Sequence, residues 1–403
     1  PVNGGAIRLP DTPDLCLRYE VSLDSPLRRG HGGWRTDVPL KDTLVSPSVW
    51  LWQPPLNDAT TLRVTFDLPE AMRVSVPWQP LEDAEGSRPQ FEFGTSPRSS
   101  RALSAFGEFD YREVAVPGSV LRVSLLRGAL PMDNDAIVRW LKAAATDVTL
   151  AYGRFPNPSP QIVVVPVGKR SEAVPFGRVI RDGGEAVQFF IDETRPIKEF
   201  LDDWTATHEF SHLLFPYVGD RWVSEGFATY YQNVLLARAG VYSERRAWQK
   251  LHEGFERGRR SSPGTSPNAA SMRNGGVMKI YWSGAAVALM GDVALRRHSD
   301  GAESLDTVIE KLQACCLPSA EAWTAMELFE RLDELADTPV FVDLYDRYAD
   351  APDFPSVDAV YRLLGISIGR GDRVRLTTSG EGAVLRRAMM ALSPDVAAAR
   401  GTD

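Results

Sequence analysis

The sequence has little cysteine, little histidine and no long hydrophobic run. Its 403 residues include only 3 Cys and 5 His. The longest apolar runs, such as 285–290, are far shorter than the roughly 20 residues that cross a membrane, so we expect no membrane span. Three cysteines cannot form a disulfide framework. Because Cys315 and Cys316 are adjacent, they are too close for relaxed disulfide geometry, and we expect three free and mostly buried thiols.

Positively charged residues are fewer than negatively charged residues. The chain carries 45 Lys and Arg against 53 Asp and Glu, a net charge of -8, which argues against a general affinity for nucleic acid or for an anionic membrane. Hydrophobic residues make up 43% and charged residues 24%, as in ordinary globular proteins, so the fibrous and disordered classes are excluded. A chain of this length predicts two or three domains. No pattern indicates the oligomeric state.

The first residues bear on localisation. The chain begins at Pro1, without Met and without a charged-then-apolar leader. This pattern is expected of a processed, exported protein and equally of a trimmed chain. We therefore predict a periplasmic or extracellular protein, with a cytoplasmic location as the alternative.

Residues 1–128 predict an N-terminal β-sandwich domain. Short segments that alternate between apolar and polar residues recur along this part, with 61–68 the clearest, and turns containing Pro or Gly separate them. We group the long alternating segment 112–126 with these strands. Several short strands with frequent turn signals are typical of a sandwich.

After residue 128 the pattern becomes mixed and then mostly helical. We predict buried strands at 161–167 and 185–192, a loop of low order at 257–276, and helices at 133–144, 224–239, 247–255, 281–297 and, as short pieces, over 302–364. The fold class is therefore α+β and multidomain. We expect an α/β domain at 129–298, a helical C-terminal domain at 299–368 and a tail of uncertain structure at 369–403.

One segment carries the residues of a metal site. His208, Glu209 and His212 form a His-Glu-x-x-His pattern within a helical, apolar stretch. Side chains four residues apart lie on one face of a helix, so both imidazoles can reach one metal ion. Glu209 is turned by about 100° from His208 and points beside the metal, where a bound water would lie.

A third ligand follows on the next predicted helix. Zinc in catalytic sites takes three protein ligands and keeps one open position. Glu225 comes thirteen residues after His212, and the segment 215–220 supplies the turn between them. We therefore predict one Zn²⁺ per chain, bound by His208, His212 and Glu225. Zinc lowers the pKa of its water toward about 7, and Glu209 is predicted as the general base.

Two alternatives are a structural helix with an incidental His pair and a zinc site without catalysis. Two of the 5 His in the chain fall in this motif, and a suitable Glu follows them, so chance is disfavoured. Thr229 lies four residues after Glu225 and faces the same side of the helix. We predict that it accepts the second N–H of a ligand histidine; the alternatives are a Thr that faces solvent and one that bonds back to the helix backbone.

These motifs resemble those of a known family. His208 to His212, together with Trp-Val-Ser-Glu-Gly-Phe-Ala-Thr-Tyr-Tyr at 222–231, resembles the gluzincin metallopeptidases. Within these the chain is most similar to the glycyl aminopeptidases, relatives of the alanyl aminopeptidases and leukotriene hydrolase. Gly33-Trp34 matches the Gly-Trp of that family's N-terminal β-domain. The resemblance implies a thermolysin-like α/β catalytic domain at 129–298.

The resemblance also implies a catalytic tyrosine and a substrate-binding strand. The segment 280–292 is similar to the family's Tyr-x-x-Gly-Ala helix, in which the tyrosine is catalytic, so Tyr281 is expected to donate to the developing oxyanion. Family topology implies that 186–192 is an edge strand that pairs with extended substrate, with an ordinary interior strand as the alternative.

Three features depart from the family pattern. The spacing from His212 to Glu225 is shorter than usual, and no PDZ domain is expected, because only 38 of the 403 residues follow Gly365. The Gly-x-x-Glu motif that grips a substrate amino terminus is echoed only at 183–188. Glu185 is the one acidic residue of 183–191, so Glu185 and Gly184 are predicted to bind substrate.

These observations together predict a zinc metallopeptidase with peptide as its partner. The leading hypothesis is an aminopeptidase acting on short peptides. The alternatives are a zinc endopeptidase with the same catalytic residues and a non-catalytic, peptide-binding relative. The presence of both Glu209 and Tyr281 argues against the non-catalytic alternative.

Overall fold

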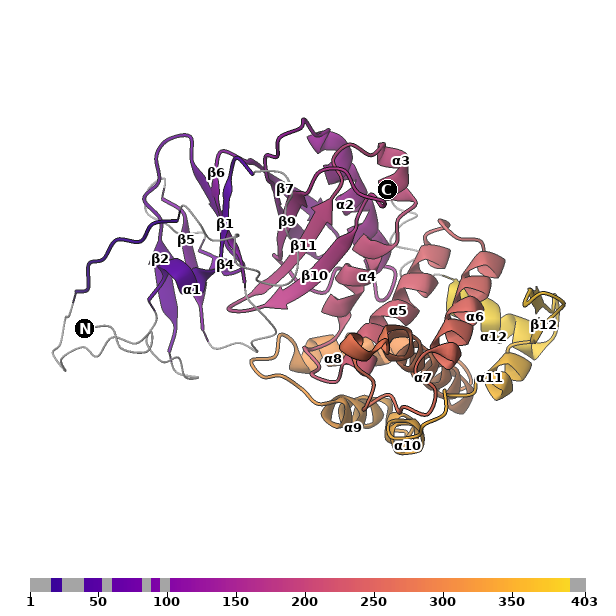
Figure 1. The fold of residues 1–403 in the computed structure, drawn as a ribbon. Coiled ribbons are helices and arrows are strands. Elements are labelled where there is room, and N and C mark those ends of the chain that lie inside the picture. Colours follow the sequence, from indigo (N-terminus) through magenta and orange to yellow (C-terminus); the bar gives the residue numbers. More distant parts are fainter. Residues whose placement is uncertain (1–15, 24–39, 53–59, 82–87, 95–101, 392–403) are drawn as a thin grey trace.

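A computed structural model describes residues 16–23, 40–52, 60–81, 88–94 and 102–391 (Figure 1). The described chain is a mixed α/β protein, as expected. The Gly33-Trp34 pair lies outside the described residues. Among the described residues, no helix is both long and apolar enough to cross a membrane.

The first strands form two small sheets that share an aromatic core. One sheet has the order β1-β6-β3 and the other the order β2-β5-β4. Buried rings such as Phe66, Trp78 and Phe91 pack against side chains of both sheets. The bounds are β1 (Thr43–Val45), β2 (Leu62–Thr65), β3 (Arg73–Ser75), β4 (Gln79–Pro80), β5 (Gln90–Phe93) and β6 (Ser104–Gly107), with a short helix α1 (Pro47–Trp50) after β1.

A five-stranded sheet occupies the middle of the molecule (Figure 1). Its order is β10-β11-β9-β8-β7; the β8–β9 and β9–β11 pairs are parallel, and the two outer pairs are antiparallel. Val164 and Phe189 face the helices, whereas Val163 and Phe190 face Leu44 and other residues of the N-terminal strands. The bounds are β7 (Asp110–Val116), β8 (Ser119–Leu125), β9 (Gln161–Pro166), β10 (Phe176–Arg181) and β11 (Glu185–Ile191).

This sheet corrects the grouping of segment 112–126. Its residues form β7 and β8, and the backbone of β8 pairs with β9 and not with the N-terminal sheets. Apolar alternation identifies a strand but carries no information about the partner strand. We therefore propose that the N-terminal unit ends near residue 109, before β7, and not at 128.

The sheet also corrects the expected edge strand. The predicted strand at 186–192 is β11, which lies between β9 and β10, so it is an interior strand. The outermost strands are β7 and β10, and the sequence analysis missed β10. Gly177 interrupts this strand, and Arg178 and Arg181 give it a polar character, so it lacks the apolar signal that marks buried strands.

Helix α2 lies between β8 and β9 in the chain, the helices from α3 onward follow the sheet, and the helical layer covers one face of the sheet (Figure 1). The long helices α5 and α7 pack on each other at the centre, and α2 and α4 lie between them and the sheet. The bounds are α2 (Asn134–Val148), α3 (Ile197–Leu201), α4 (Thr205–Ser211), η1 (His212–Leu214), α5 (Arg221–Arg238), α6 (Glu244–Arg260), η2 (Met272–Asn274), α7 (Val277–His298), α8 (Leu305–Cys316), α9 (Ala325–Ala336), α10 (Phe341–Tyr348) and α11 (Asp358–Leu363).

Helix α6 runs further than predicted. Residues 257–260, which the sequence analysis assigned to a loop of low order, form its last turn. Gly258 is buried there, and a Cβ at this position would collide with the side chains of Trp282 and Phe354. The glycine that resembled a loop signal is thus a point of close packing within a helix.

The segment after residue 368 has defined structure as far as residue 391. Strands β12 (Ile366–Ile368) and β13 (Val374–Leu376) form a hairpin, and α12 (Glu381–Met390) follows. Arg386 anchors this helix by an ion pair with Glu244 and a hydrogen bond to the carbonyl of Leu364. A boundary at 368 would divide the hairpin, so we propose that the last unit continues at least to residue 391.

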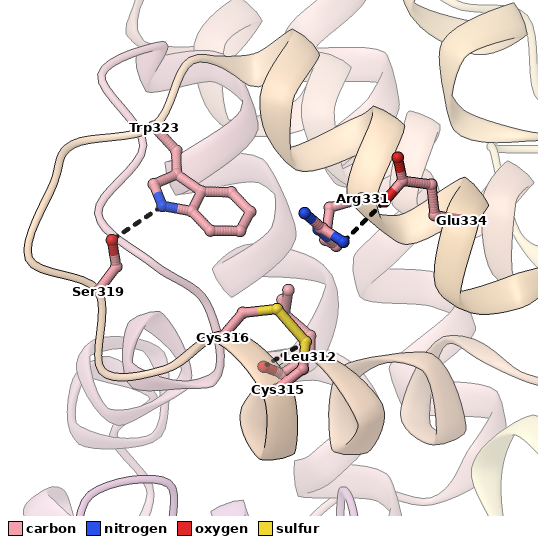
Figure 2. Close-up of a disulfide and its surroundings, with 7 residues drawn as sticks. All are labelled: Leu312, Cys315, Cys316, Ser319, Trp323, Arg331 and Glu334. Carbon is pink, nitrogen blue, oxygen red and sulfur yellow. Dashed lines mark hydrogen bonds and ion pairs between the residues drawn. A yellow bond between two sulfur atoms is a disulfide. The ribbon is translucent and has the colours of Figure 1, made fainter.

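The cysteine prediction is wrong in two respects. Cys315 and Cys316 form a disulfide at the end of α8 (Figure 2), and Cys16 is exposed. The Cα atoms of the pair are 3.7 Å apart, below the usual range of about 4.4–6.8 Å on which the expectation was based. The chain leaves the helix directly after Cys316, since Leu317 has an extended backbone, so the pair is not held within a continuing helix.

Candidate metal centre

The three predicted metal ligands lie together. His208 is on α4, His212 begins the 3-10 turn η1 that continues α4, and Glu225 is on the first turns of α5. One potential ligand atom from each residue lies within 4.8 Å of the others. The Nε2 atoms of His208 and His212 are 3.4 and 3.5 Å from the same Glu225 oxygen. Two imidazoles and one carboxylate therefore converge on a single point.

The turn that ends the histidine helix is fixed from two sides. The side chain of Gln313 on α8 donates to the carbonyls of Leu213 and Leu214. Arg181, at the end of β10, donates to the carbonyls of His212 and Phe215. Because carbonyls at a helix end have no partner within the helix, these bonds define where the helix stops and hold His212 in place. Sequence analysis found neither residue, since each lies far from the motif in the chain.

Electrostatics within the cluster favour a charged Glu225. Burial alone would raise its pKa, but hydrogen bonds and charge from His208 and His212 hold that pKa far below its usual range. Burial lowers the pKa of both histidines. At His208, Glu225 and Glu209 outweigh this effect, and the pKa is raised. At His212 burial prevails, and the pKa is lowered. A buried carboxylate between two imidazoles is a strong site for a cation.

Glu209 lies beside the cluster in a space left by a glycine. Its side chain is buried, and burial is the main cause that raises its pKa to about 7; the charge of Glu225 adds to this rise. A Cβ on Gly177 of β10 would lie 2.5 Å from the Cγ atom of Glu209. The outermost strand of the sheet thus packs directly against the predicted general base.

Tyr281 on α7 faces the same cluster. Its ring lies nearly parallel to that of His208, with 5.7 Å between ring centres and 16° between planes. Burial and the charges of Glu225 and Glu209 raise its pKa, so the hydroxyl stays protonated at neutral pH. Tyr230 and Tyr231 are occupied elsewhere, because their hydroxyls donate to Asp292 and Asp306.

The ring nitrogens that face away from the cluster have different surroundings. Nδ1 of His212 is 3.4 Å from the hydroxyl of Ser224, a contact that sequence analysis did not predict. Nδ1 of His208 and Oγ1 of Thr229 are both buried and have no hydrogen-bond partner among the described residues, although Gln232 contributes to the raised pKa of His208. The hydrogen bond predicted for Thr229 stays a prediction.

The predicted substrate residues lie at the start of β11. The carboxylate of Glu185 pairs with Arg181 at 2.9 Å and accepts a hydrogen bond from Asn157 at 2.7 Å. Gly184 packs against the N-terminal region, because a Cβ there would collide with the backbone carbonyl of Pro77. The partners of Glu185 shown here are one cation and one amide of the protein itself, so its role toward a substrate amine stays a prediction.

Two glycines bring the ligand helix and the tyrosine helix into contact. A Cβ on Gly226 would collide with the Cα atom of Gly284, and a Cβ on Gly284 would collide with the carbonyl of Trp222. Gly226 follows the ligand Glu225 directly, and Gly284 lies three residues after Tyr281. The close backbone approach of α5 and α7 therefore sets how far Tyr281 lies from the ligands.

A family model described as M61 glycyl aminopeptidase matches residues 215–283. The matched segment includes Glu225, Gly226 and Tyr281 and ends one residue before Gly284. No curated protein matches the sequence.

Among solved structures, an aminopeptidase N family protein from Idiomarina loihiensis is similar over 81% of this chain, with 14% identity and a TM-score of 0.60. The chain is therefore similar to glycyl aminopeptidases over residues 215–283 and to an aminopeptidase N family protein in its fold. It spans 62% of that structure's chain. Other similar structures are an M1 zinc metallopeptidase from Deinococcus radiodurans (14% identity, 73% of this chain, 64% of that chain, TM-score 0.46) and yeast LTA4 hydrolase (12% identity, 76% of this chain, 50% of that chain, TM-score 0.48).

The packing of β10 on Glu209 gives a testable expectation. Replacing Gly177 with alanine should lower kcat for peptide hydrolysis by about 10- to 100-fold, because a displacement of about 1 Å in a catalytic group has effects of this size. Metal content should be unchanged, since the three atoms nearest to the added Cβ all belong to Glu209 and not to a predicted ligand. Steady-state kinetics with metal analysis measure both. Gly264→Ala is the control, because a Cβ there meets nothing within 4 Å, although its left-handed backbone can reduce stability.

Proposed function

We propose that the protein is a zinc-dependent peptidase, with cleavage of short peptides from the amino terminus as its main activity. The observation that carries this proposal is the convergence of two imidazoles and one carboxylate within 4.8 Å, with Glu209 and Tyr281 beside them. The match to a glycyl aminopeptidase model and the aminopeptidase-like fold support the peptidase class. A zinc metallopeptidase among the similar structures agrees with the choice of metal.

The residues present fit zinc. Two neutral nitrogen donors and one carboxylate are a donor set that zinc takes in catalytic sites. In the described part of the chain, Glu225 forms no ion pair outside this cluster, so its charge is available to balance a cation. His208, His212 and Glu225 would bind one Zn²⁺ per chain, which, when bound, supplies a Lewis acid that makes water nucleophilic at neutral pH.

The protein's own side chains supply the remaining steps. Glu209 accepts the proton of the attacking water and passes it to the leaving amine, and burial keeps its pKa near that of a useful base. Tyr281 keeps its proton and donates to the oxyanion that develops on the peptide carbonyl. Extended substrate pairs with the outermost strand β10, which lies against Glu209. Thr229 and Ser224 orient the two histidines through their second ring nitrogens.

A second candidate is an endopeptidase with the same catalytic residues. An aminopeptidase must hold the substrate ammonium at a fixed distance from the metal, and a carboxylate is the natural partner. The carboxylate of Glu185 is already bound by Arg181 and Asn157. This arrangement favours the endopeptidase, unless substrate displaces one of those partners.

The test compares free-amine peptides with otherwise identical N-blocked peptides. We expect zinc-loaded protein to cleave the free-amine set, a chelator to abolish cleavage, and zinc to restore it. Metal analysis should give about one zinc per chain, and His208→Ala should lose it. Efficient cleavage of blocked peptides would replace the aminopeptidase by the endopeptidase. No zinc uptake by the wild type, or full uptake by His208→Ala, would refute the metal site.

A further inference from the structure

A basic pocket lies between the start of α6 and the hairpin β12–β13. Its cavity has a volume of about 730 Å³. Six of its ten lining residues are cationic, whereas Lys and Arg make up 45 of 403 residues in a chain of net charge -8. The cationic residues are Arg245, Arg246, Lys250, Arg370, Arg373 and Arg375.

Two basic segments, the start of α6 and the hairpin β12–β13, are held close together by hydrogen bonds. The side chain of Gln249 on α6 donates to the carbonyl of Asp372 at 2.9 Å and accepts from the amide of Val374 at 2.8 Å. These two bonds attach the hairpin to the helix. The turn of the hairpin uses left-handed backbone at Gly371 and Asp372, which places Arg370 and Arg373 on either side of it. The two bonds of Gln249 therefore hold the backbone of both basic segments together.

The charge of the pocket is not balanced by the protein. None of the six cations forms an ion pair within the described ranges, in contrast to Arg238 and Arg386 nearby, which pair with Asp306 and Glu244. Glu253 is the single carboxylate on the lining. Burial lowers the pKa of Lys250, and the charge of Arg246 lowers it further. Like charges held this close repel one another, and an anionic ligand would relieve that repulsion.

We propose that this pocket binds a compact polyanion, a small molecule that carries two or more phosphate-type groups. Arginine presents a planar fork of donors that binds phosphate oxygens in pairs, and five of the six cations are arginines. The volume is that of a small-molecule site. The amino-terminal end of the 17-residue helix α6 adds positive potential beside it.

Two observations disfavour a nucleic-acid strand as the ligand. Single-strand sites combine cations with aromatic side chains on which bases stack, and the lining of this pocket contains no aromatic residue. The ring of Tyr242, close to the start of α6, is already covered by Arg246 and Lys250, at 4.4 and 5.1 Å from its centre.

The pocket is separate from the metal centre. Glu225 lies near the start of α5, and α6 begins shortly after Arg238, at the far end of the same helix. Thirteen residues of helix separate Glu225 from Arg238, which corresponds to about 20 Å. Binding at this pocket therefore requires neither the metal nor the proposed peptidase activity.

Calorimetric titration of the full chain with inorganic tripolyphosphate tests the proposal. We expect saturable binding of one ligand per chain that weakens as salt is added. The double variant Arg246→Gln/Arg373→Gln should weaken binding by about 100-fold, because each charge-assisted hydrogen bond is worth about tenfold. Both side chains are exposed, so the fold should be retained, as circular dichroism would verify. Arg139→Gln/Arg297→Gln, an equal change of charge at two exposed sites outside the pocket, should bind like the wild type.

Other results would overturn the proposal. Equal weakening in Arg139→Gln/Arg297→Gln would show that net charge, and not the pocket, attracts the anion. Absence of saturable binding at low salt would refute the site. Tighter binding of a hexaglutamate peptide or a single-stranded oligonucleotide than of tripolyphosphate, lost in the double variant, would assign the pocket to an extended polymer and not to a compact ligand.

Discussion

Replacing Glu209 with glutamine is expected to lower kcat by about 10²-fold or more while metal content stays at the wild-type value. The amide has nearly the same shape as the carboxylate, so it fits the space beside Gly177. It cannot accept the proton of the attacking water, however, and the proton-transfer step loses its base. Steady-state kinetics with a free-amine peptide, together with metal analysis, measure both quantities.

The control for Glu209→Gln is Glu199→Gln. Glu199 is on α3, where its half-exposed side chain pairs with Arg195, so the same chemical change takes place outside the centre. We expect wild-type turnover from this variant. Turnover close to that of the wild type in Glu209→Gln itself would remove Glu209 from the mechanism and leave the metal site without an assigned base.

Replacing Gly284 with alanine is expected to destabilise the protein by about 3 kcal/mol and to reduce turnover severely. Helix propensity alone predicts the opposite, since alanine in a helix is favoured over glycine by about 1 kcal/mol. The added Cβ would collide with the carbonyl of Trp222 and push α7 away from α5. Overpacking of this kind costs about 1–3 kcal/mol or more, and the shift would displace Tyr281 from the ligands.

Thermal melting and kinetics of Gly284→Ala measure this effect. Arg297→Ala is the matched control, because it places the same residue at an exposed position of the same helix. We expect its melting temperature to equal or exceed that of the wild type. A raised melting temperature in Gly284→Ala would mean that propensity dominates and that the helices can separate at little cost.

The local part of the site was predictable from the sequence. His208 and His212 are four residues apart, so the geometry of a single helix already brings them together. Glu225 required one further assumption, that the next helix folds back, and a short turn makes that the simplest path. The glycines of the α5–α7 crossing could have been found as well, since Gly226 and Gly284 both lie inside strongly helical patterns, where glycine signals close packing.

The rest depends on contacts between distant segments. Arg181 and Gln313 hold the turn after His212 by bonds to residues that are 31 and 100 positions away in the sequence. No local spacing reveals such bonds. The strand β10 was missed because Gly177, Arg178 and Arg181 leave it without the apolar pattern that marks a buried strand. The same limit explains why β7 and β8 were assigned to the wrong sheet and β11 to the wrong position within its sheet.

The bonds made by Arg181 have a consequence for which peptide bond of a substrate would lie at the catalytic groups. One guanidinium joins the last residue of β10 to the turn that carries His212, and Glu185 holds that guanidinium from the neighbouring strand. The position of strand β10 is therefore fixed relative to the turn that carries the predicted ligand His212. For a peptide paired with β10, a slip of two residues would bring a different bond, about 7 Å further along the peptide, to the same catalytic groups. Arg181 thus fixes the position of β10 relative to the catalytic groups. The register in which a substrate pairs with β10 would then decide the length of the fragment released.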